Sequence, residues 1–434
     1  MSEKIGITRG TVLLLGTRAV IILISIATSA IIARYLGPSG KGVLALLVTI
    51  NALAWQFGNI GLPSANVYFV AKNRELLSKI VANSLWFGVT GAGAAVFFIS
   101  LLYIFFHKII LVDIRFPLLL ISLLSLPAFF VSYLLSNILW GMQKVKVVNK
   151  LNLLNSALFL ISAITVCLLL KQGITGIVIA NLTVYYICAL VYMLYLKMPE
   201  KIDCFFDKKL FLNMRGYAAR SYISCLLGFL IIKSDIFLVN FFLGSSATGV
   251  YSIDVAFADM IYILPATIGA LLFPKIAAGS NTMELTQRIS RHLIFIMLII
   301  CIFAGILSKF AIRFIYGEMY LGAITPFYWL LPGIFCLGIG TLFMNDLAGR
   351  GQPPIVYIAP GISLLLNILL NLIFIPRYGV TGAAITSSLA YGLMAILTIW
   401  YFIRLTGTSL RDAVLIKGNE IIGLFNKLRI SHKG

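Results

Sequence analysis

This chain of 434 residues is 61% hydrophobic, carries only 11% charged residues and has a formal net charge of +20. Soluble domains average about 45–50% apolar and about 25% charged residues, so the composition excludes an ordinary soluble domain and indicates a membrane protein. A basic excess of this size is also compatible with nucleic-acid binding, and the placement of the charges along the chain distinguishes the two cases.

Apolar segments long enough to cross a bilayer follow one another along the chain. A spanning helix needs about 20 mostly apolar residues. This criterion predicts twelve transmembrane helices, at 11–35, 42–66, 80–106, 114–140, 150–170, 174–197, 217–243, 247–273, 289–314, 322–348, 354–375 and 380–404. We therefore expect an all-α polytopic membrane protein. Its least regular span is expected near 320–350, which contains Pro326 and Pro332.

The basic residues are distributed unevenly between the two sides of these spans. Of the 34 Lys and Arg residues, 24 lie on the side of the N-terminus, eight lie on the opposite side, and Arg18 and Lys233 lie within helices. Cytoplasmic connections of membrane proteins are enriched in Lys and Arg. The pattern predicts that both termini are cytoplasmic, and it makes nucleic acid an unexpected partner.

Three short motifs occur once in each half of the chain. LGPSGKGV (36–43) recurs as LGSSATGV (243–250), GMQK (141–144) as GRGQ (349–352), and KQGITGIVIA (171–180) as RYGVTGAAIT (377–386), at offsets of 207, 208 and 206 residues. Six predicted spans separate the copies, so each copy returns to the same face and the repeat is parallel. We expect two six-helix lobes around a central cavity, at 1–200 and 217–404. A cytoplasmic linker at 201–216 would join them, and a basic tail at 405–434 would follow.

The first pair of motifs has the composition of a tight turn between antiparallel helices. Gly37 and Gly244 suit the left-handed conformation that ends a helix. Gly42 and Gly249, about one turn further on, suit a close approach of helices. A compact outer-face hairpin accounts for each of these residues without a role in binding.

The sequence around these turns resembles a known family. The first hairpin reads A-R-x-L-G-P-x-G-x-G, and a later segment places a basic-x-Asp pair before L-G-x-x-x-x-G-x-Y. The matching residues are Ala33, Arg34, Leu36, Gly37, Pro38, Gly40 and Gly42, then Lys233, Asp235, Leu243, Gly244, Gly249 and Tyr251. In these motifs, and in its length and span number, the chain resembles the Wzx-like polysaccharide flippases, the O-antigen and exopolysaccharide exporters of the MOP superfamily. That superfamily also holds the MATE exporters and the lipid II flippases.

The resemblance implies a MATE-like fold and a function. A polyprenyl-pyrophosphate-linked oligosaccharide would pass from the cytoplasmic to the outer leaflet by alternating access, with its polyprenyl tail in lipid. The location implied is the bacterial cytoplasmic (inner) membrane. The partners implied are the lipid-linked substrate, membrane lipid, and a polysaccharide polymerase with its chain-length machinery.

Charged residues within predicted spans are the first candidate site residues, because each costs about 2.5–3.5 kcal/mol to insert. Lys233 and Asp259 lie equally far from the turn at 243–250 and can pair, with Asp235 and Asp254 nearer the outer surface. Two interpretations remain open. The pair is structural and the other aspartates face water, or Lys233 contacts anionic substrate while Asp235, Asp254 and Asp259 provide for a coupling H⁺ or Na⁺.

Two further groups suggest substrate contacts. Arg18, roughly 10 Å into the first helix, either grips a pyrophosphate or extends to the cytoplasmic interface. Asn51, Trp55 and Gln56 make the second helix polar, which predicts that it faces a cavity where Trp55 stacks on a sugar ring; packing between helices explains its glycines equally well. Asp346 is expected to pair with Arg350 at i+4.

Other function classes fit less well. No predicted outer connection exceeds about a dozen residues, and the sequence shows no nucleophile–base pair or metal cluster, so we expect neither an enzyme nor a metal site, and no cofactor beyond a coupling ion. A MATE-type cation/drug antiporter is the alternative, and it would require an acidic cavity. The tail at 409–434 either forms an amphipathic helix on the inner leaflet or is solvated.

Overall fold

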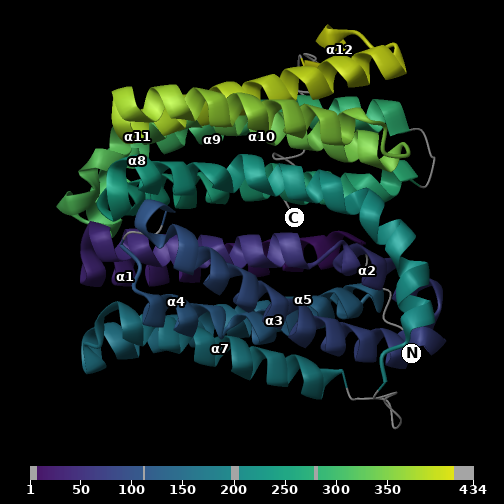
Figure 1. The fold of residues 1–434 in the computed structure, drawn as a ribbon. Coiled ribbons are helices and arrows are strands. Elements are labelled where there is room, and N and C mark those ends of the chain that lie inside the picture. The colour runs from purple at the N-terminus through teal and green to yellow at the C-terminus, as the bar shows by residue number, and fades with distance from the viewer. Residues whose placement is uncertain (1–6, 111–112, 197–204, 278–281, 415–434) are drawn as a thin grey trace, which may run out of the picture. The chain divides into compact units, whose positions relative to one another are not determined.

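The computed structural model describes residues 7–110, 113–196, 205–277 and 282–414, in which the regular elements are all helices (Figure 1). The principal ones are α1 (Ile7–Gly58), α2 (Leu62–Lys72), α3 (Leu77–Ile110), α4 (Phe116–Leu123), α5 (Leu126–Gly141), α6 (Val145–Ile164), α7 (Gly173–Tyr195), α8 (Lys208–Ala277), α9 (Thr282–Ile315), α10 (Ile324–Gly349), α11 (Ile355–Thr406) and α12 (Leu410–Val414). Among the described residues, nine segments are long and apolar enough to cross a membrane. The expectation of an all-helical polytopic membrane protein is confirmed.

Three of these segments are too long for one crossing. α1 and α11 each contain 52 residues and α8 contains 70, and each is interrupted by one non-helical glycine, at Gly37, Gly244 and Gly379. A side-chain contact across each break shows that the chain reverses there: Lys41 with Ser29, Lys233 with Asp259, and Thr386 with Asn371. Lys233 Nζ lies 2.8 Å from Asp259 Oδ2, although a continuous helix would separate residues 26 apart by about 39 Å. Division at the glycines turns the nine segments into twelve.

The internal repeat is visible in the backbone. Gly37 and Gly244 have φ of 68° and 79° with ψ of −179° in both, a combination that is essentially restricted to glycine. The other motif pairs also place positive φ at matching positions. These are Gln143 with Gly351, and Gly173 with Gly379. The first motif therefore encodes the same backbone turn in both halves, and the other two pairs share a position of positive φ.

The two copies of the first turn also contact each other. Ser39 Oγ lies 3.1 Å from Ser245 Oγ. A Cβ added to Gly42 would lie 1.8 Å from the carbonyl oxygen of Ser245, and one added to Gly249 would lie 1.9 Å from that of Pro38. Because the offset of 207 relates Gly42 to Gly249 and Pro38 to Ser245, the contact is reciprocal, as in an interface with twofold symmetry. The predicted close approach at both glycines is confirmed.

Several helix boundaries differ from the predicted ones. The second span ends at Gly58, and α2 begins at Leu62 after a turn. The fourth is divided into α4 and α5 next to Pro127, which has no amide hydrogen for a continuous helix. In contrast, Pro332 lies inside an unbroken α10, so the region expected to be least regular is a continuous helix from Ile324 to Gly349.

The first helical residues of α8 lie within the predicted linker at 201–216, since the helix begins at Lys208. Asp207 caps it by accepting a bond from the amide of Leu210 at 2.9 Å. The same carboxylate lies 3.1 Å from Lys79 Nζ, and the backbone of Asp207 exchanges two hydrogen bonds with the side chain of Asn83. The Leu210 amide, followed by Lys79, lowers the pKa of the Asp207 carboxyl below its ordinary value.

The described chain forms two compact units. Unit 1 takes in Met1–Phe229, Ile236–Ser252 and Arg313–Tyr320, and unit 2 takes in Leu230–Asp235, Ile253–Ile312 and Leu321–Gly434. In unit 1, α1 packs on α6, α3 on α5 and α6 on α7; in unit 2, α10 packs on α11. Each unit thus has its own helical core.

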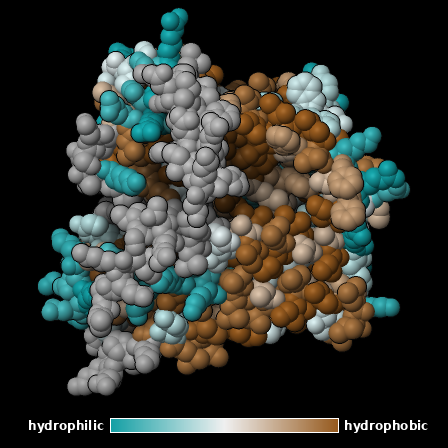
Figure 2. Space-filling model, turned by 180° about the vertical axis from the view of Figure 1, so that it is seen from behind, coloured by the Kyte–Doolittle hydropathy of each residue, from teal (hydrophilic) through white to brown (hydrophobic). Residues whose placement is uncertain are grey.

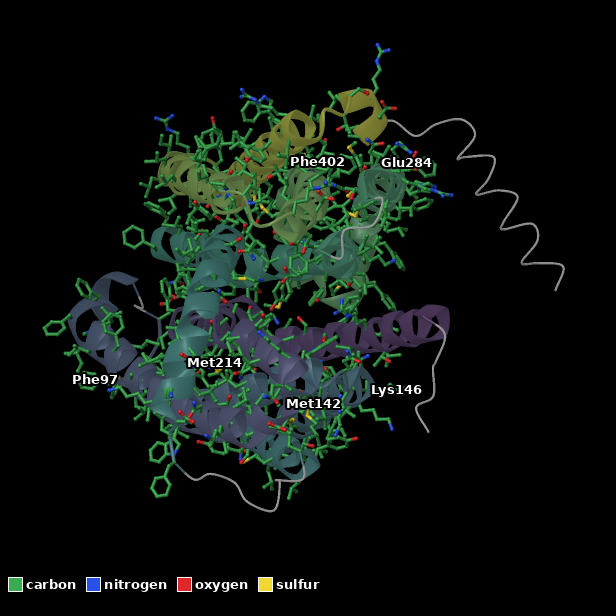
Figure 3. The ribbon with its side chains drawn as sticks, turned by 90° about the vertical axis from the view of Figure 1, so that its right-hand side faces the viewer. Phe97, Met142, Lys146, Met214, Glu284 and Phe402 are labelled. Atoms are coloured by element: carbon green, nitrogen blue, oxygen red, sulfur yellow. The ribbon has the colours of Figure 1, made fainter. Side chains whose placement is uncertain are left out.

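The surface is apolar where lipid would contact it. Figure 2 shows hydrophobic side chains over much of the middle of the visible face and hydrophilic ones towards its edges. Phe97 on α3, labelled in Figure 3, is 72% exposed and Leu169 is 74% exposed. Large side chains of this kind would make an aggregating surface in water and are the expected lipid contacts of a membrane protein. The predicted tail lies outside the described residues beyond Val414, which ends the short helix α12.

Candidate transport site

A buried polar cluster in unit 2 is centred on Asp235, which is 1% exposed. Its carboxylate accepts a bond from Asn371 Nδ2 at 2.7 Å and another from the hydroxyl of Ser387. Asn371 Nδ2 also donates to Asn367 Oδ1 at 3.0 Å, and Thr386 Oγ1 donates to Asn371 Oδ1 at 2.5 Å. The Asp235 carboxylate is therefore held by an amide N–H and a hydroxyl, one on each of its oxygens.

The fold of α11 brings this cluster together. Asn367 and Asn371 are one helical turn apart on one face, and the reversal at Gly379 returns Thr386 and Ser387 to that face. All four are fully buried. We predicted a role for Asp235 but not for these partners. Two asparagines at i and i+4 inside the apolar stretch ISLLLNILLNLIFI (362–375) were the available signal, because polar residues inside membrane helices bond across helices.

Asp254, on the second half of α8, is fully buried. Neither of its carboxylate oxygens has a hydrogen-bond partner among the described residues. Burial of an unpaired carboxylate is costly, so the side chain is suited to hold a proton or a cation. Among the three candidate ion-coupling residues, Asp254 is the one whose buried carboxylate most needs a bound proton or cation.

Lys233 and Asp259 form the predicted ion pair, with Nζ and Oδ2 2.8 Å apart. Their side chains are 23% and 47% exposed, so the pair is partly open. Asp346 and Arg350 also pair as expected, at 2.6 Å, and Thr286 donates to the same aspartate at 2.6 Å. The fully buried Asp346 is therefore satisfied within unit 2.

The candidate substrate residues of unit 1 have different surroundings. Arg18 is half-buried on α1. The buried Asn51 donates to the carbonyl and hydroxyl of Ser122 and to the hydroxyl of Ser125, at the break between α4 and α5. Gln56 is half-buried. The side-chain amide of Asn51 thus stabilises the break between α4 and α5, which lies more than 70 residues further along the chain.

Trp55 is 9% exposed and lies within an aromatic cluster. Its ring centroid is 4.9 Å from that of Phe130, 5.1 Å from that of Tyr133 and 6.0 Å from that of Phe129. The contacts with Phe129 and Phe130 are edge-to-face, an arrangement that contributes to packing. Trp55 is not among the residues that line either described cavity, and its contact with a sugar ring stays a prediction.

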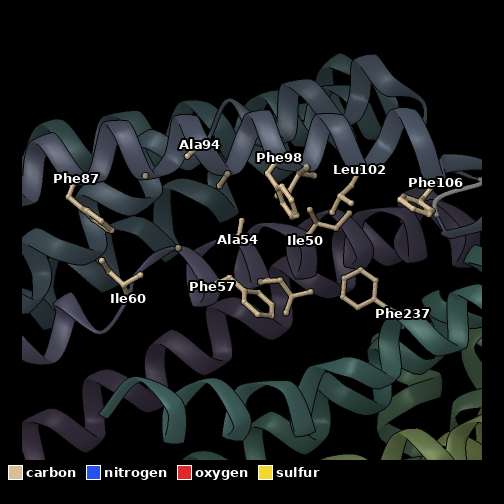
Figure 4. Close-up of a pocket in the computed structure, with 15 residues that line it drawn as sticks. Ile50, Ala54, Phe57, Ile60, Phe87, Ala94, Phe98, Leu102, Phe106 and Phe237 are labelled. Carbon is tan, nitrogen blue, oxygen red and sulfur yellow. The ribbon is translucent and has the colours of Figure 1, made fainter. Parts of the chain in front are cut away.

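Two cavities of opposite chemistry lie in unit 1. One, of about 570 Å³, is lined by 15 apolar residues between α1 and α3, with Phe237 reaching it from α8 (Figure 4). Its lining has no side-chain hydrogen-bonding group, so it suits hydrocarbon and not sugar or phosphate. The other, of about 260 Å³, lies among α5, α6 and α7 and is lined mainly by Ser, Asn and Tyr. Neither lining contains an acidic residue.

Comparison with known proteins decides the family. The family model described as "Polysaccharide biosynthesis protein" matches residues 31–325. The chain belongs to this polysaccharide biosynthesis family. The resemblance to Wzx-like flippases is confirmed, and the protein is a membrane transporter of this family, not an enzyme.

Relatives of this polysaccharide biosynthesis protein carry transport names. A Shigella flexneri protein named "Putative O-antigen transporter" is 25% identical over 405 residues, covering 88% of this chain and 94% of the relative. A Haloferax volcanii protein named "Probable low-salt glycan biosynthesis flippase" is 25% identical over 211 residues, covering 46% of this chain and 45% of the relative.

Solved structures share the fold of this family member. A lipid II flippase in an inward closed conformation has a TM-score of 0.75 at 18% identity, covering 92% of this chain and 89% of the other. An inward-facing MATE multidrug transporter of the MOP superfamily has a TM-score of 0.70 at 15% identity, covering 89% and 95%. The predicted MATE-like fold is confirmed.

Proposed function

We propose that this protein moves a polyprenyl-pyrophosphate-linked oligosaccharide from the cytoplasmic to the outer leaflet of a bacterial cytoplasmic membrane. The observation that carries the proposal is the alignment with an O-antigen transporter over 94% of that relative's length. The match covers nearly the whole transporter, so the similarity extends across the transport machinery and not over one shared segment.

The proposed architecture is two parallel six-helix lobes around a central cavity, at 1–200 and 217–404, with a linker at 201–216 and both termini in the cytoplasm. The recurrence of the same turn conformation at Gly37 and Gly244 supports the parallel repeat. The 24 basic residues on the N-terminal side support the orientation. Alternating access would expose the cavity to one leaflet and then to the other.

The chemistry of the substrate assigns roles to the candidate residues. A pyrophosphate is an anion, and Arg18 and Lys233 supply cations within spans. Asn51, Trp55 and Gln56 belong to the wall that supports the glycan path. Asp235, Asp254 and Asp259 are the groups for a coupling ion, H⁺ or Na⁺, with Asp254 suited by its unpaired carboxylate. A polysaccharide polymerase and its chain-length machinery are the partners that would use the flipped substrate.

Depletion of the protein tests the function. Cells that lose it should accumulate lipid-linked glycan that an impermeant probe cannot reach from outside. A suitable probe is a membrane-impermeant hydrazide that labels sugars oxidised by periodate. Re-expression should restore labelling within one growth cycle. Normal outer-leaflet labelling in depleted cells would refute the proposal.

A MATE-type cation/drug antiporter is the second candidate, and the buried, unpaired Asp254 favours it, because such a group can exchange a cation for a proton. The alignment with an O-antigen transporter over 94% of that relative's length favours the flippase. Drug-resistance assays in cells overexpressing the protein separate the two, since an ion-coupled flippase moves its coupling ion but exports no drug.

A further inference from the structure

The polar cavity of unit 1 lies near the ends of three helices. Trp140 stands one residue before the end of α5, and Tyr192 stands three residues before the end of α7. Asn152 is about 10 Å along α6 from its first residue. Figure 3 labels Met142 and Lys146 beside this turn between α5 and α6. In the proposed topology this connection is cytoplasmic, so the cavity occupies the cytoplasmic half of the membrane.

The lining excludes most classes of ligand. It consists of three asparagines, two serines, three tyrosines, Trp140 and Cys188, and none of these ten carries a charge. A phosphate would call for Arg or Lys, and a divalent metal cation would call for carboxylates, which this lining lacks. A hydrocarbon chain would leave the amides and hydroxyls without partners. A neutral ligand rich in hydroxyl groups satisfies such a surface.

One hydroxyl in the lining, that of Ser132, has no hydrogen bond among the described residues. Ser132 is buried, at 7% exposed. Buried polar groups are nearly always bonded, so this one indicates a missing ligand atom or water. Nearby, Tyr192 donates to Asn152 Oδ1 at 3.3 Å, a long bond that a ligand hydroxyl can replace.

The aromatic walls are held in place from behind. The ring of Phe129 lies 4.7 Å from that of Tyr133 and 5.1 Å from that of Tyr185, and Trp55 lies 5.1 Å from Tyr133. These contacts fix the two tyrosine rings before any ligand enters. Rigid aromatic rings with a few polar groups are the usual make-up of small-ligand pockets.

We propose that this cavity binds one uncharged sugar ring of the translocated glycan as the ring crosses the cytoplasmic half of the membrane; the proposal rests on the function proposed above. The volume of about 260 Å³ equals that of about nine water molecules at ~30 Å³ each. This room suits a single ring with a few waters and excludes a folded oligosaccharide. The apolar faces of the ring would lie on the tyrosine and tryptophan rings, and its hydroxyls would bond Ser132 and the asparagines.

Photocrosslinking in intact cells tests the ligand class with the native substrate. A small diazirine side chain placed at Asn155, inside the polar cavity, should yield an adduct whose mass and fragmentation include a sugar. The same side chain at Phe98, in the apolar cavity, should yield lipid adducts without sugar and shows that the chemistry works. Lipid adducts alone at position 155, or no adduct there, would overturn the proposal.

Variants supply a second measurement. Trp140→Ala should lower outer-leaflet display of the glycan on the order of tenfold at unchanged membrane abundance, with Trp140→Phe restoring part of it. Trp86→Ala is the matched control, because Trp86 is 51% exposed on α3 and lies outside the cavity. Equal display in Trp140→Ala and Trp86→Ala would overturn the proposal. If depletion of the whole protein leaves display normal, the proposed function fails instead, so the two failures are distinguishable.

Discussion

Substitution of the two glycines at the reciprocal turn contact should separate the turns measurably. At Gly42 an alanine Cβ would lie 1.8 Å from the Ser245 carbonyl oxygen, and at Gly249 it would lie 1.9 Å from that of Pro38. Real contacts of a Cβ are essentially never below 3.0 Å, so the backbones must move apart by at least 1.2 Å, the difference between 3.0 and 1.8 Å. The obstacle is a backbone atom and cannot rotate away. Overpacking of this kind costs about 1–3 kcal/mol.

Disulfide formation reports this separation directly. Because Ser39 Oγ and Ser245 Oγ are 3.1 Å apart, Ser39→Cys with Ser245→Cys should oxidise rapidly in membranes. Cleavage at a protease site inserted in the linker then shows whether the halves stay joined. Gly42→Ala or Gly249→Ala should slow oxidation about tenfold or more and lower the thermal stability.

Gly93→Ala is the matched control, since Gly93 lies in α3 with open space around it. It should leave oxidation unchanged and should stabilise the helix slightly, by roughly 0.5–1 kcal/mol. If Gly42→Ala oxidises and melts like Gly93→Ala, the two turns do not contact each other as described and the reasoning is refuted.

Four further predictions concern the charged groups. Arg18→Ala should impair transport at normal abundance with Arg18→Lys partly restoring it; wild-type transport by the alanine variant would leave Arg18 an interfacial residue. Exchanging the charges of Lys233 and Asp259 should restore transport lost in either single variant if the pair is structural, and should fail if Lys233 contacts substrate. Asp235→Asn should abolish the dependence of transport in proteoliposomes on a Na⁺ or H⁺ gradient. The pKa of the Asp207 carboxyl is lowered from its ordinary value of 3.8, so its stabilising contacts are fully present at any pH above 3.8. They are lost only as the pH falls through the lower pKa of the folded protein. Linker proteolysis should therefore be constant from pH 8 to 5, and it should be faster in Asp207→Asn throughout that range.

The sequence predicts local geometry well where one residue type alone can adopt it. Gly37 and Gly244 have a backbone conformation that other residues avoid, so their turns could be read from spacing and composition. The lengths of the apolar segments predicted the helices for a different reason, because the thickness of the bilayer sets the length of a spanning helix. The division at Pro127 was missed, since a proline in a membrane helix either breaks it or, as Pro332 shows, leaves it continuous.

The candidate sites depend on contacts between residues far apart in the chain. Asp235 was recognised as an unusual charge, but its donors Asn371 and Ser387 lie 136 and 152 residues away. Trp55 was expected to stack on a sugar ring, and its packing against Phe129, Phe130 and Tyr133 on α5 could not be read from its own position. Residue type indicates that a polar or aromatic group is unusual in a membrane span, whereas packing decides which surface it serves.

Several interior positions related by the internal repeat carry different side chains in the two halves of the chain. At the offset of 207 that relates the first turns, Asp235 corresponds to Thr28, and at 206, Asn371 corresponds to Thr165. At 208, Trp140 of the polar cavity corresponds to Ala348, and Tyr133 corresponds to Thr341. The first turn needs glycine in both halves because its backbone conformation is essentially restricted to that residue, whereas these interior positions carry different side chains in the two halves. The buried carboxylate cluster is formed by residues of unit 2 and the uncharged aromatic cavity by residues of unit 1, so each unit has its own kind of site.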